Sequence, residues 1–387
     1  MIKKFFLAAG AVFALIGLSN LALREPFLSS NDFYIMRLLS GRNFFVRSAH
    51  QPGSSDTAME LSRESFRMNG AQESFSRDKK AGTFRIFCVG GSTTRGWPFN
   101  PHLSYPLLAE AYLKDLLPGR KTEVINAGFC GSDSTSDLPL FKELMNYQPD
   151  LVLIYEGRND VGNMVFHAGY KSRLLEAHVW LLRHVFLYGF LKNKLLSGRR
   201  FQLDHAKTLR RFMGGGENFD GSALRNLLEG NLRRMIHTGR ENHCRVVLLT
   251  QALSLNEIRN KTVMVNVNEW IRRLAADCQA GLVDIDGAFR GSEIPYDELV
   301  IPHPVHPDLE GYFLMAKTVC RYLAEENIIA PGKEWQWENL KTDGQYLEEL
   351  GVKDDFLSSV YRERLGDLLK NSLNKPELAE VYYKKGA

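Results

Sequence analysis

Five short apolar runs alternate with amphipathic stretches between Thr83 and Ala330, and this alternation constrains the fold more than any other feature. The runs read "TFRIFCVGG", "KTEVINAG", "PDLVLIYEG", "CRVVLLTQ" and "GLVDID". The stretches with helical spacing read "SYPLLAEAYLKDLLPG", "TSDLPLFKELMNYQ", "SALRNLLEGNLRRMIHTGREN" and "VNEWIRRLAADCQ", and a further helix is expected from Pro307. Strands that are apolar on both faces belong in a parallel sheet covered by helices on both sides. We therefore expect one α/β domain over residues 83–330, built on a five-stranded parallel sheet.

The N-terminal segment predicts a membrane anchor. Residues 1–23 read "MIKKFFLAAGAVFALIGLSNLAL", with two lysines followed by an almost uncharged apolar run. This run is about as long as a hydrocarbon core of ~30 Å requires at ~1.5 Å per residue. The lysines favour a cytoplasmic N-terminus, which places the rest of the chain on the periplasmic or extracellular side. We expect a retained signal anchor (a transmembrane helix); a cleaved signal peptide is the alternative, although the run lacks a clean Ala-x-Ala site.

Three further segments lie outside the alternating pattern. Residues 24–82 form an N-terminal extension in which "HQPGSSDTAMELSRES" has no clear apolar period and is typical of a tether. Residues 161–221 are a helical insertion containing "HVWLLRHVFLYGFLKNKLL". Its charges favour an amphipathic helix, either packed on the domain or serving as a lid or membrane-resting surface. Residues 331–387 predict a helical C-terminal extension.

Charge and cysteine usage exclude several classes of protein. The 387 residues carry a formal net charge of +4 without a clustered basic patch, so we expect no nucleic-acid partner. The five cysteines include no CxxC pair, and their odd number excludes a complete disulfide framework within one chain. Cys130 follows a strand end, but we do not expect it to be catalytic. No cluster of His, Cys, Asp and Glu has the spacing of metal ligands, so we expect no metal.

The glycine turn in "FCVGGSTTRGWPF", residues 87–99, either binds phosphate or presents a nucleophile. A P-loop needs GxxxxGK[ST], and no such lysine follows these glycines. A dinucleotide loop needs GxGxxG, and Ser92 takes the place of the second glycine. The nucleophile elbow GxSxG needs a glycine where the chain has Thr94. We therefore expect no nucleotide cofactor, and the elbow of the α/β-hydrolases is also absent.

Ser92 is nevertheless well placed for nucleophilic chemistry. It follows the first strand, and open α/β sheets hold their sites at the carboxyl ends of the strands. Gly128 ends the second strand and Asn159 follows the third, so both lie at the same edge. A serine hydroxyl that attacks an ester creates a negative oxygen, which fixed N–H donors stabilise. The backbone amides of Ser92 and Gly128 and the side chain of Asn159 would supply three donors. His306 precedes the last helix of the domain, where a base can reach the first strand's end.

These four blocks resemble the SGNH (GDSL-type) hydrolase superfamily. Its marker residues correspond to Ser92 in "VGGSTT", Gly128 in "NAG", Asn159 in "GRND" and His306 in "HPDLEGY", in the same order. The resemblance implies a flavodoxin-like three-layer αβα sandwich. It also implies metal-independent ester hydrolysis or acyl transfer through an acyl-serine intermediate, with His306 as the general base and acid.

Two positions depart from the family pattern. The first block has Gly-Gly-Ser instead of Gly-Asp-Ser, which keeps the nucleophile. His303 stands three residues before His306, where the family normally has the aspartate that orients the imidazole. Three alternatives stay open: a Ser–His dyad oriented by a backbone carbonyl, another acid in place of the aspartate, or a low or absent activity. The candidate acids are Asp308, Asp297 and Glu293.

Charged residues beside the blocks have two interpretations. Arg95 and Arg158 would favour anionic substrates if they faced the pocket. Pairing with Asp160 or Glu156 is an equally good interpretation. Asp160 is expected to brace a loop.

The sequence thus predicts a membrane-anchored, extracytoplasmic serine esterase. Its location suggests acylated carbohydrates or lipids as substrates. An O-acyltransferase acting on surface polysaccharide is the alternative enzyme. A catalytically inactive binding or assembly module is the alternative outside enzymes, because the usual aspartate is missing.

Overall fold

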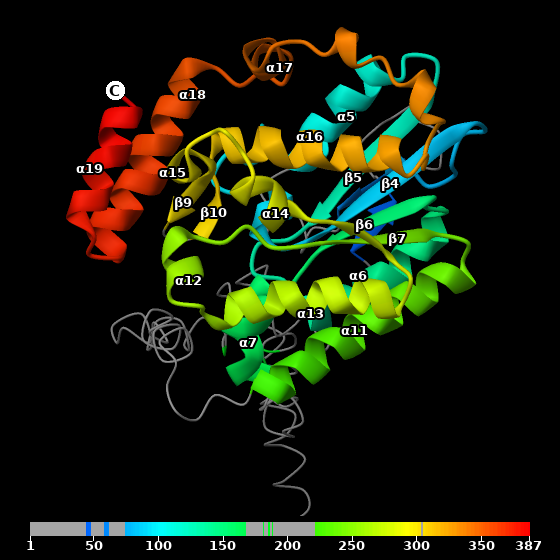
Figure 1. Cartoon of the computed structure of the whole chain (residues 1–387), viewed down its shortest axis with the longest axis horizontal. Helices are drawn as coiled ribbons and strands as arrows, with labels where there is room; N and C mark the ends of the chain where they lie inside the picture. The colour runs from blue at the N-terminus through cyan, green and yellow to red at the C-terminus, as the bar shows by residue number, and fades with distance from the viewer. Residues whose placement is uncertain are drawn as a thin grey trace, which may run out of the picture. The chain divides into compact units, whose positions relative to one another are not determined.

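A five-stranded parallel sheet forms the core of the unit made of residues 43–161 and 212–387, as predicted. Its strand order is β5-β4-β6-β7-β8 (Figure 1). The bounds are β4 Thr83–Gly90, β5 Lys121–Gly128, β6 Leu151–Tyr155, β7 Arg245–Leu249 and β8 Gly281–Val283. Numbered along the chain this order is 2-1-3-4-5, the flavodoxin-like arrangement. Gly90 pairs with both Gly128 and Tyr155, so the three strands that lead to the predicted site end level with one another.

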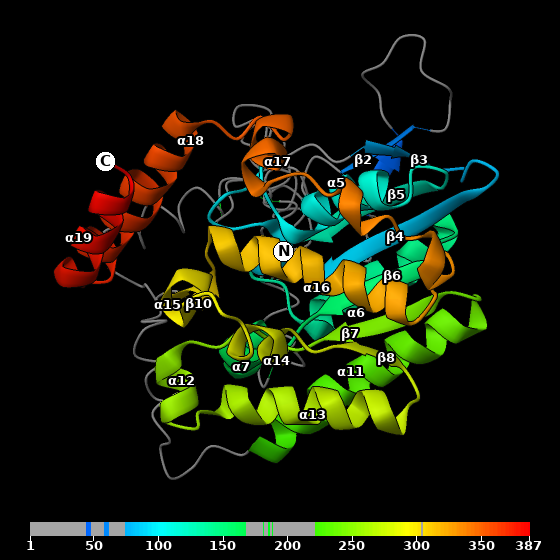
Figure 2. The same cartoon turned by 45° about the horizontal axis from the view of Figure 1, so that its top comes forward.

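Helices cover both faces of the sheet, which confirms the three-layer sandwich (Figure 1 and Figure 2). One layer holds α5 (Tyr105–Leu116), α14 (Ile285–Arg290) and α16 (Leu309–Glu325). The other holds α6 (Ser134–Leu144), α11 (Gly221–Glu241) and α13 (Val263–Asp277). The starts of these helices follow from their caps. Ser104 accepts the Leu107 amide at the start of α5, and a capping box of Asp133 and Ser136 begins α6.

The structure is a computed structural model that describes residues 44–47, 58–61, 74–167, 181, 185, 188, 221–302 and 305–387. The predicted anchor over residues 1–23, most of the insertion over residues 161–221, and His303 lie outside these ranges. Among the residues described, none of the helices is both long and apolar enough to cross a bilayer.

Part of the N-terminal extension is structured, which corrects the prediction of a tether. β1 (Phe45–Arg47), β2 (Ala58–Leu61) and β3 (Ser74–Ser76) form a three-stranded antiparallel sheet. Phe75 lies 5.4 Å from Phe87 of β4 and 5.2 Å from Tyr147, measured between ring centroids. These strands therefore pack on the central sheet through aromatic side chains.

A short antiparallel hairpin that the sequence did not predict precedes α16. It pairs β9 (Val300–Pro302) with β10 (Val305–Pro307), and α16 begins at Leu309 rather than at Pro307. The remaining helices around the sheet are α4 (Ser92–Arg95), η1 (Met145–Tyr147), α7 (Arg158–His167), α12 (Leu255–Arg259) and α15 (Tyr296–Leu299).

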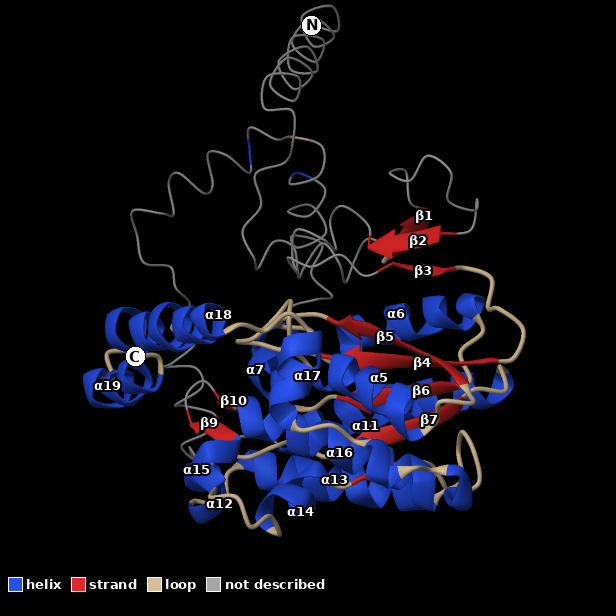
Figure 3. Ribbon diagram, turned by 90° about the horizontal axis from the view of Figure 1, so that it is seen from above, coloured by secondary structure: helices blue, strands red, loops and turns tan. Residues whose placement is uncertain are grey.

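The C-terminal extension is helical, as predicted. Its elements are η2 (Gly332–Glu334), η3 (Trp337–Asn339), α17 (Asp343–Glu349), α18 (Asp354–Ser359), η4 (Val360–Gly366), η5 (Leu368–Ser372) and α19 (Pro376–Lys385). Seen from above, α18 and α19 lie at the same end of the domain as the β9–β10 hairpin (Figure 3). That end is where the carboxyl ends of the central strands converge.

Candidate active site

Ser92 and His306 meet at the carboxyl edge of the sheet. Ser92 is the first residue of α4, directly after β4, and His306 is the middle residue of β10. The Oγ of Ser92 lies 2.6 Å from Nε2 of His306, although 214 positions separate them in the chain. This point lies between the ends of β4 and β6, where the strand order reverses and doubly wound sheets bind their ligands. The fold therefore brings the predicted nucleophile and base into hydrogen-bond contact.

Trp97 packs against the His306 imidazole, a contact that the sequence did not predict. Its ring centroid lies 4.4 Å from that of His306. The Tyr312 hydroxyl, fully buried on α16, donates to the Trp97 carbonyl at 2.7 Å. This hydrogen bond joins the turn after α4 to α16. The only sign of the Trp97–His306 contact in the sequence is an aromatic residue in the turn that follows Ser92.

Gly128, predicted as an oxyanion donor, lies where α4 packs on the end of β5. Its amide donates to Oδ1 of Asn126 at 2.9 Å. A Cβ on Gly128 would lie 2.7 Å from the Arg95 nitrogen and 2.8 Å from the Thr94 Cβ. Packing therefore requires glycine at this position, and the oxyanion role of its N–H stays a prediction.

Asn126 is a second positioning residue that the sequence analysis overlooked. Its side chain is 3% exposed and donates to the Thr94 carbonyl at 2.8 Å and to the Ser104 hydroxyl at 3.2 Å. It therefore ties the end of β5 to the helix that carries Ser92 and to the start of α5. The motif "NAG" contained this signal, since a polar residue in an otherwise apolar strand needs hydrogen-bond partners.

Asn159 lies beside the nucleophile, in the first turn of α7. Its Nδ2 donates to the Ser132 carbonyl at 2.6 Å, which fixes the amide with one N–H still to give. A Cβ on Gly91 would lie 2.5 Å from the same nitrogen. The side-chain amide of Asn159 is thus packed against the residue that precedes Ser92. The backbone N–H of Ser92 has no acceptor within its own helix, because Ser92 is the first residue of α4. Two of the three predicted donors, this N–H and the Asn159 amide, therefore lie beside the Ser92 hydroxyl.

A narrow cavity of about 10 Å³ adjoins Ser92, with room for about one water molecule. Its lining residues include Tyr155, Glu156, Asn159 and Gln251. Burial, followed by the negative charge of Asp137, raises the pKa of Glu156 well above its ordinary value. The cavity beside Ser92 is therefore small, and the carboxyl group of Glu156 in its wall is favoured in its neutral form.

The charged residues beside the blocks have structural partners. Arg158 donates to both carboxylate oxygens of Glu257, at 2.8 and 3.2 Å, rather than to Asp160 or Glu156. Asp160 accepts the amide of Ser134 at 3.2 Å and the hydroxyl of the same residue, so it braces the start of α6 as predicted. Because Glu257 neutralises Arg158, that arginine does not favour anionic substrates.

Arg95 and Cys130 are two further residues that the sequence singled out. Arg95 is 2% exposed and so presents little of its charge to solvent. Burial raises the pKa of the Cys130 thiol, which disfavours the thiolate that a nucleophilic cysteine needs.

The candidates for the third catalytic member have different outcomes. The Asp308 carboxylate is 2% exposed and accepts from the Leu309 amide, the Tyr361 hydroxyl and the Lys385 ammonium. It caps α16 and is engaged by these three donors, and its role as a third catalytic member stays a prediction. Asp297 and Glu293 are exposed, and His303 lies outside the described residues.

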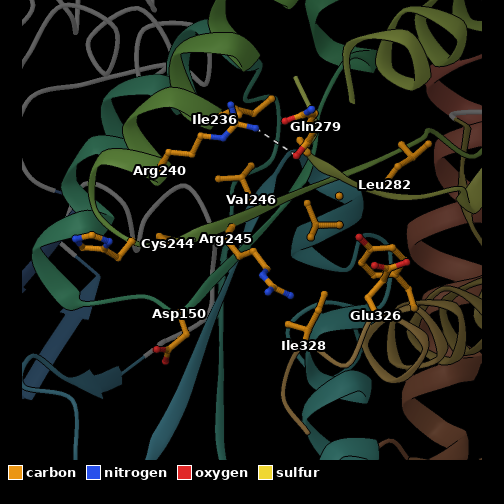
Figure 4. A pocket seen from close by; sticks show the side chains of 15 residues that line it. Asp150, Ile236, Arg240, Cys244, Arg245, Val246, Gln279, Leu282, Glu326 and Ile328 are labelled. Carbon is orange, nitrogen blue, oxygen red and sulfur yellow. Dashed lines mark hydrogen bonds between the residues drawn. The ribbon is translucent and has the colours of Figure 1, made fainter. Parts of the chain in front are cut away.

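A larger cavity lies at the opposite edge of the sheet from Ser92. It measures about 790 Å³ and opens at the amino ends of β7 and β8, where Arg240, Cys244 and Glu326 line it (Figure 4). Burial, and next the charge of Asp150, raises the pKa of the Cys244 thiol to about 12. A thiol this weakly acidic is not a nucleophile at neutral pH.

Comparisons with known proteins identify the family. The family model for the GDSL-like Lipase/Acylhydrolase family matches residues 88–314. No curated protein matches the chain. Among solved structures, the chain is similar to a catalytic mutant of an acetylxylan esterase from Geobacillus stearothermophilus, at 18% identity and a TM-score of 0.42, over 63% of this chain and 96% of that one. It is also similar to an α/β hydrolase enzyme from the metagenome of Lake Arreo, Spain, at 18% identity and a TM-score of 0.42, over 64% and 97%. Because the family model spans more than half of the sequence, the protein belongs to the GDSL-like lipase/acylhydrolase family of SGNH hydrolases.

Proposed function

We propose that this protein is a serine esterase with Ser92 as nucleophile and His306 as general base and acid. Its family implies an esterase or acyl hydrolase activity. The observation that carries the specific assignment is the 2.6 Å distance between Ser92 Oγ and His306 Nε2. A nucleophile in hydrogen-bond contact with its base is what proton transfer requires. The same contact argues against the inactive binding module.

The proposed reaction proceeds in two halves. His306 Nε2 takes the proton of Ser92 as Oγ forms a bond to the ester carbonyl carbon, and the carbonyl oxygen becomes negative. The Ser92 N–H and the Asn159 amide are the donors available to that oxygen. The carbon–oxygen bond to the leaving alcohol then breaks, and His306 returns the proton to the alcohol. Water repeats these steps on the acyl-serine and releases the carboxylic acid.

The substrate and the location belong to the proposal as well. The narrow cavity beside Ser92 favours a short acyl group such as acetyl. The apolar sequence of residues 1–23 supports a membrane-anchored, extracytoplasmic enzyme. Together these features favour acylated carbohydrates, and next acylated lipids, as substrates. An O-acyltransferase would use the same acyl-serine and pass it to a sugar hydroxyl.

A fluorophosphonate probe tests the nucleophile. We expect the wild type and Cys130→Ala to be labelled equally and Ser92→Ala not to be labelled. His306→Ala should react at least tenfold more slowly, since base catalysis typically contributes about 10²–10⁴ in rate. Wild-type labelling no faster than that of Ser92→Ala would refute the esterase. Adding an oligosaccharide to a reaction with a chromogenic acetyl ester then distinguishes transfer to sugar from hydrolysis.

A further inference from the structure

The C-terminal helices α18 and α19 lie at the same end of the domain as the β9–β10 hairpin (Figure 1 and Figure 3). Side chains from this C-terminal region contact both sides of the proposed site. Three side chains make the polar contacts: Tyr361 and Arg364 of η4 and Lys385 of α19. We call these three residues the C-terminal clamp. They lie beyond residue 314, where the family match ends, so the match assigns them no role.

On the side of His306, the clamp contacts Asp308, the residue that caps α16. Lys385 Nζ lies 2.8 Å from Oδ2 of Asp308, and the Tyr361 hydroxyl donates to Oδ1 at 3.0 Å. Asp308 is two residues after His306, and its amide donates to the Leu299 carbonyl at 2.9 Å. A carboxylate buried this deeply is costly without an opposite charge and hydrogen bonds. The clamp supplies both at the point where β10 turns into α16.

On the side of the nucleophile, the clamp binds the turn over residues 97–100. Arg364 Nη1 donates to the carbonyls of Pro98 at 2.8 Å and Asn100 at 2.7 Å. The Tyr361 ring meets Phe99 edge-on, with 5.8 Å between centroids. This turn starts at Trp97, whose indole packs on the His306 ring. The clamp thus touches both segments that flank the imidazole.

We propose that the C-terminal clamp positions His306 for reaction with Ser92, through Asp308 on one side and the 97–100 turn on the other. The proposal rests on the proposed function. The clamp residues touch neither the substrate nor the reacting atoms, so they are positioning residues. Their effect is on the turnover of bound substrate, because a small misplacement of a base lowers the rate without removing binding contacts.

Lys385→Met is the main test. We expect kcat to fall about tenfold or more with KM changed less than threefold, and Lys385→Arg to restore most of the activity. The matched control is Lys317→Met. Lys317 lies 2.9 Å from Asp343, with 33% of its side chain exposed against 38% for Lys385. Both lysines also lie over an aromatic ring, Lys317 over Phe313 at 5.7 Å and Lys385 over Tyr361 at 4.8 Å. The control should keep wild-type kcat.

A second measurement does not depend on catalysis: the NMR titration of the His306 imidazole. In the part of the chain that the structure describes, the other titratable groups around Asp308 are Tyr312, Tyr361 and Tyr382, whose pKa values burial raises, and Glu310 on its own helix. The tyrosines are neutral at working pH, so Lys385 is the cation that offsets the aspartate. Lys385→Met should raise the pKa of His306, since the carboxylate is then uncompensated. Asp308→Asn should lower it, and the two shifts together measure whether the Asp308–Lys385 pair is coupled to the imidazole.

The outcomes separate the two proposals. A lower kcat in Lys385→Met, rescue by arginine and opposite shifts of the imidazole pKa would support the clamp. Wild-type kcat and an unmoved His306 titration in Lys385→Met would overturn it, even if Ser92 reacts with the probe. If Ser92 does not react in the wild type, the esterase proposal fails, and the NMR titration still decides whether the clamp acts on His306.

Discussion

Replacing Gly128 by alanine tests whether this glycine serves packing or catalysis. The added Cβ would meet backbone atoms of α4 at 2.7 Å, the nitrogen of Arg95, and at 2.9 Å, the carbonyl carbon of Thr94. Backbone atoms cannot rotate away, so α4 must move by about 0.7 Å to restore an ordinary contact distance of 3.4 Å. Overpacking of this kind typically costs about 1–3 kcal/mol of unfolding free energy.

The same movement reaches the proposed nucleophile. Ser92 begins α4, so a shift of about 0.7 Å should lower kcat about 25-fold, given that a misplacement of 1 Å can cost about 10²-fold. Alanine keeps the backbone N–H and its acceptor, Oδ1 of Asn126, so the variant removes no hydrogen-bond donor. The loss would therefore come from geometry alone.

Urea unfolding and hydrolysis of a chromogenic acetyl ester measure the two effects. Gly119→Ala is the control, because a Cβ there meets nothing within 4 Å. If Gly128→Ala kept wild-type stability within about 0.5 kcal/mol and wild-type kcat within twofold, the packing argument would be wrong.

Two further predictions concern stability. The raised pKa of Glu156 means that the folded state holds its proton more tightly than the unfolded chain, whose carboxyl titrates near 4.5, so wild-type stability should decline as pH rises above that value. Glu156→Gln should remove this decline. If the urea midpoint changed between pH 5 and pH 8 by the same amount in the wild type and the variant, the raised pKa of Glu156 would be contradicted. Phe75→Ala should lower the unfolding free energy by about 3 kcal/mol, because the ring is 6% exposed and packs on Phe87 and Tyr147. A loss below 1 kcal/mol in the same urea titration would show that β1–β3 add nothing to the domain.

The central sheet was predictable because its strands lie in runs that are apolar on both faces and alternate regularly with helical stretches. β4, β5 and β6 occur where "TFRIFCVGG", "KTEVINAG" and "PDLVLIYEG" predict them, and each run ends in residues of the candidate site. Ser92, Asn159 and His306 are brought to one edge by a rule of topology that needs no knowledge of side-chain packing.

The short strands could not be predicted in the same way. β9 and β10 have three residues each within "VIPHPVHP", and proline normally argues against a strand. β1, β2 and β3 have three or four residues each, too few for a periodic pattern, and they form because Phe45 and Phe75 find a surface on the sheet. Their pairing depends on the rest of the fold.

The packing around the site depends on the rest of the fold in the same way. A glycine in a sequence shows no neighbours, so the close packing of Gly128 against α4 could not be predicted. The partners of Asp308, Tyr361 and Lys385, lie 53 and 77 residues further along the chain. Sequence proximity to His306 gives no sign of these two contacts.

The separation of Ser92 and His306 by 214 positions has a consequence for how activity arises. If His306 activates Ser92 as proposed, we expect a partly folded chain that has formed β4, β5 and β6 to carry a serine hydroxyl of ordinary reactivity, because β10 has not yet joined it. Reactivity toward the probe should then appear only when nearly the whole domain is assembled. The time at which probe labelling begins during refolding would report when β10 docks beside Ser92.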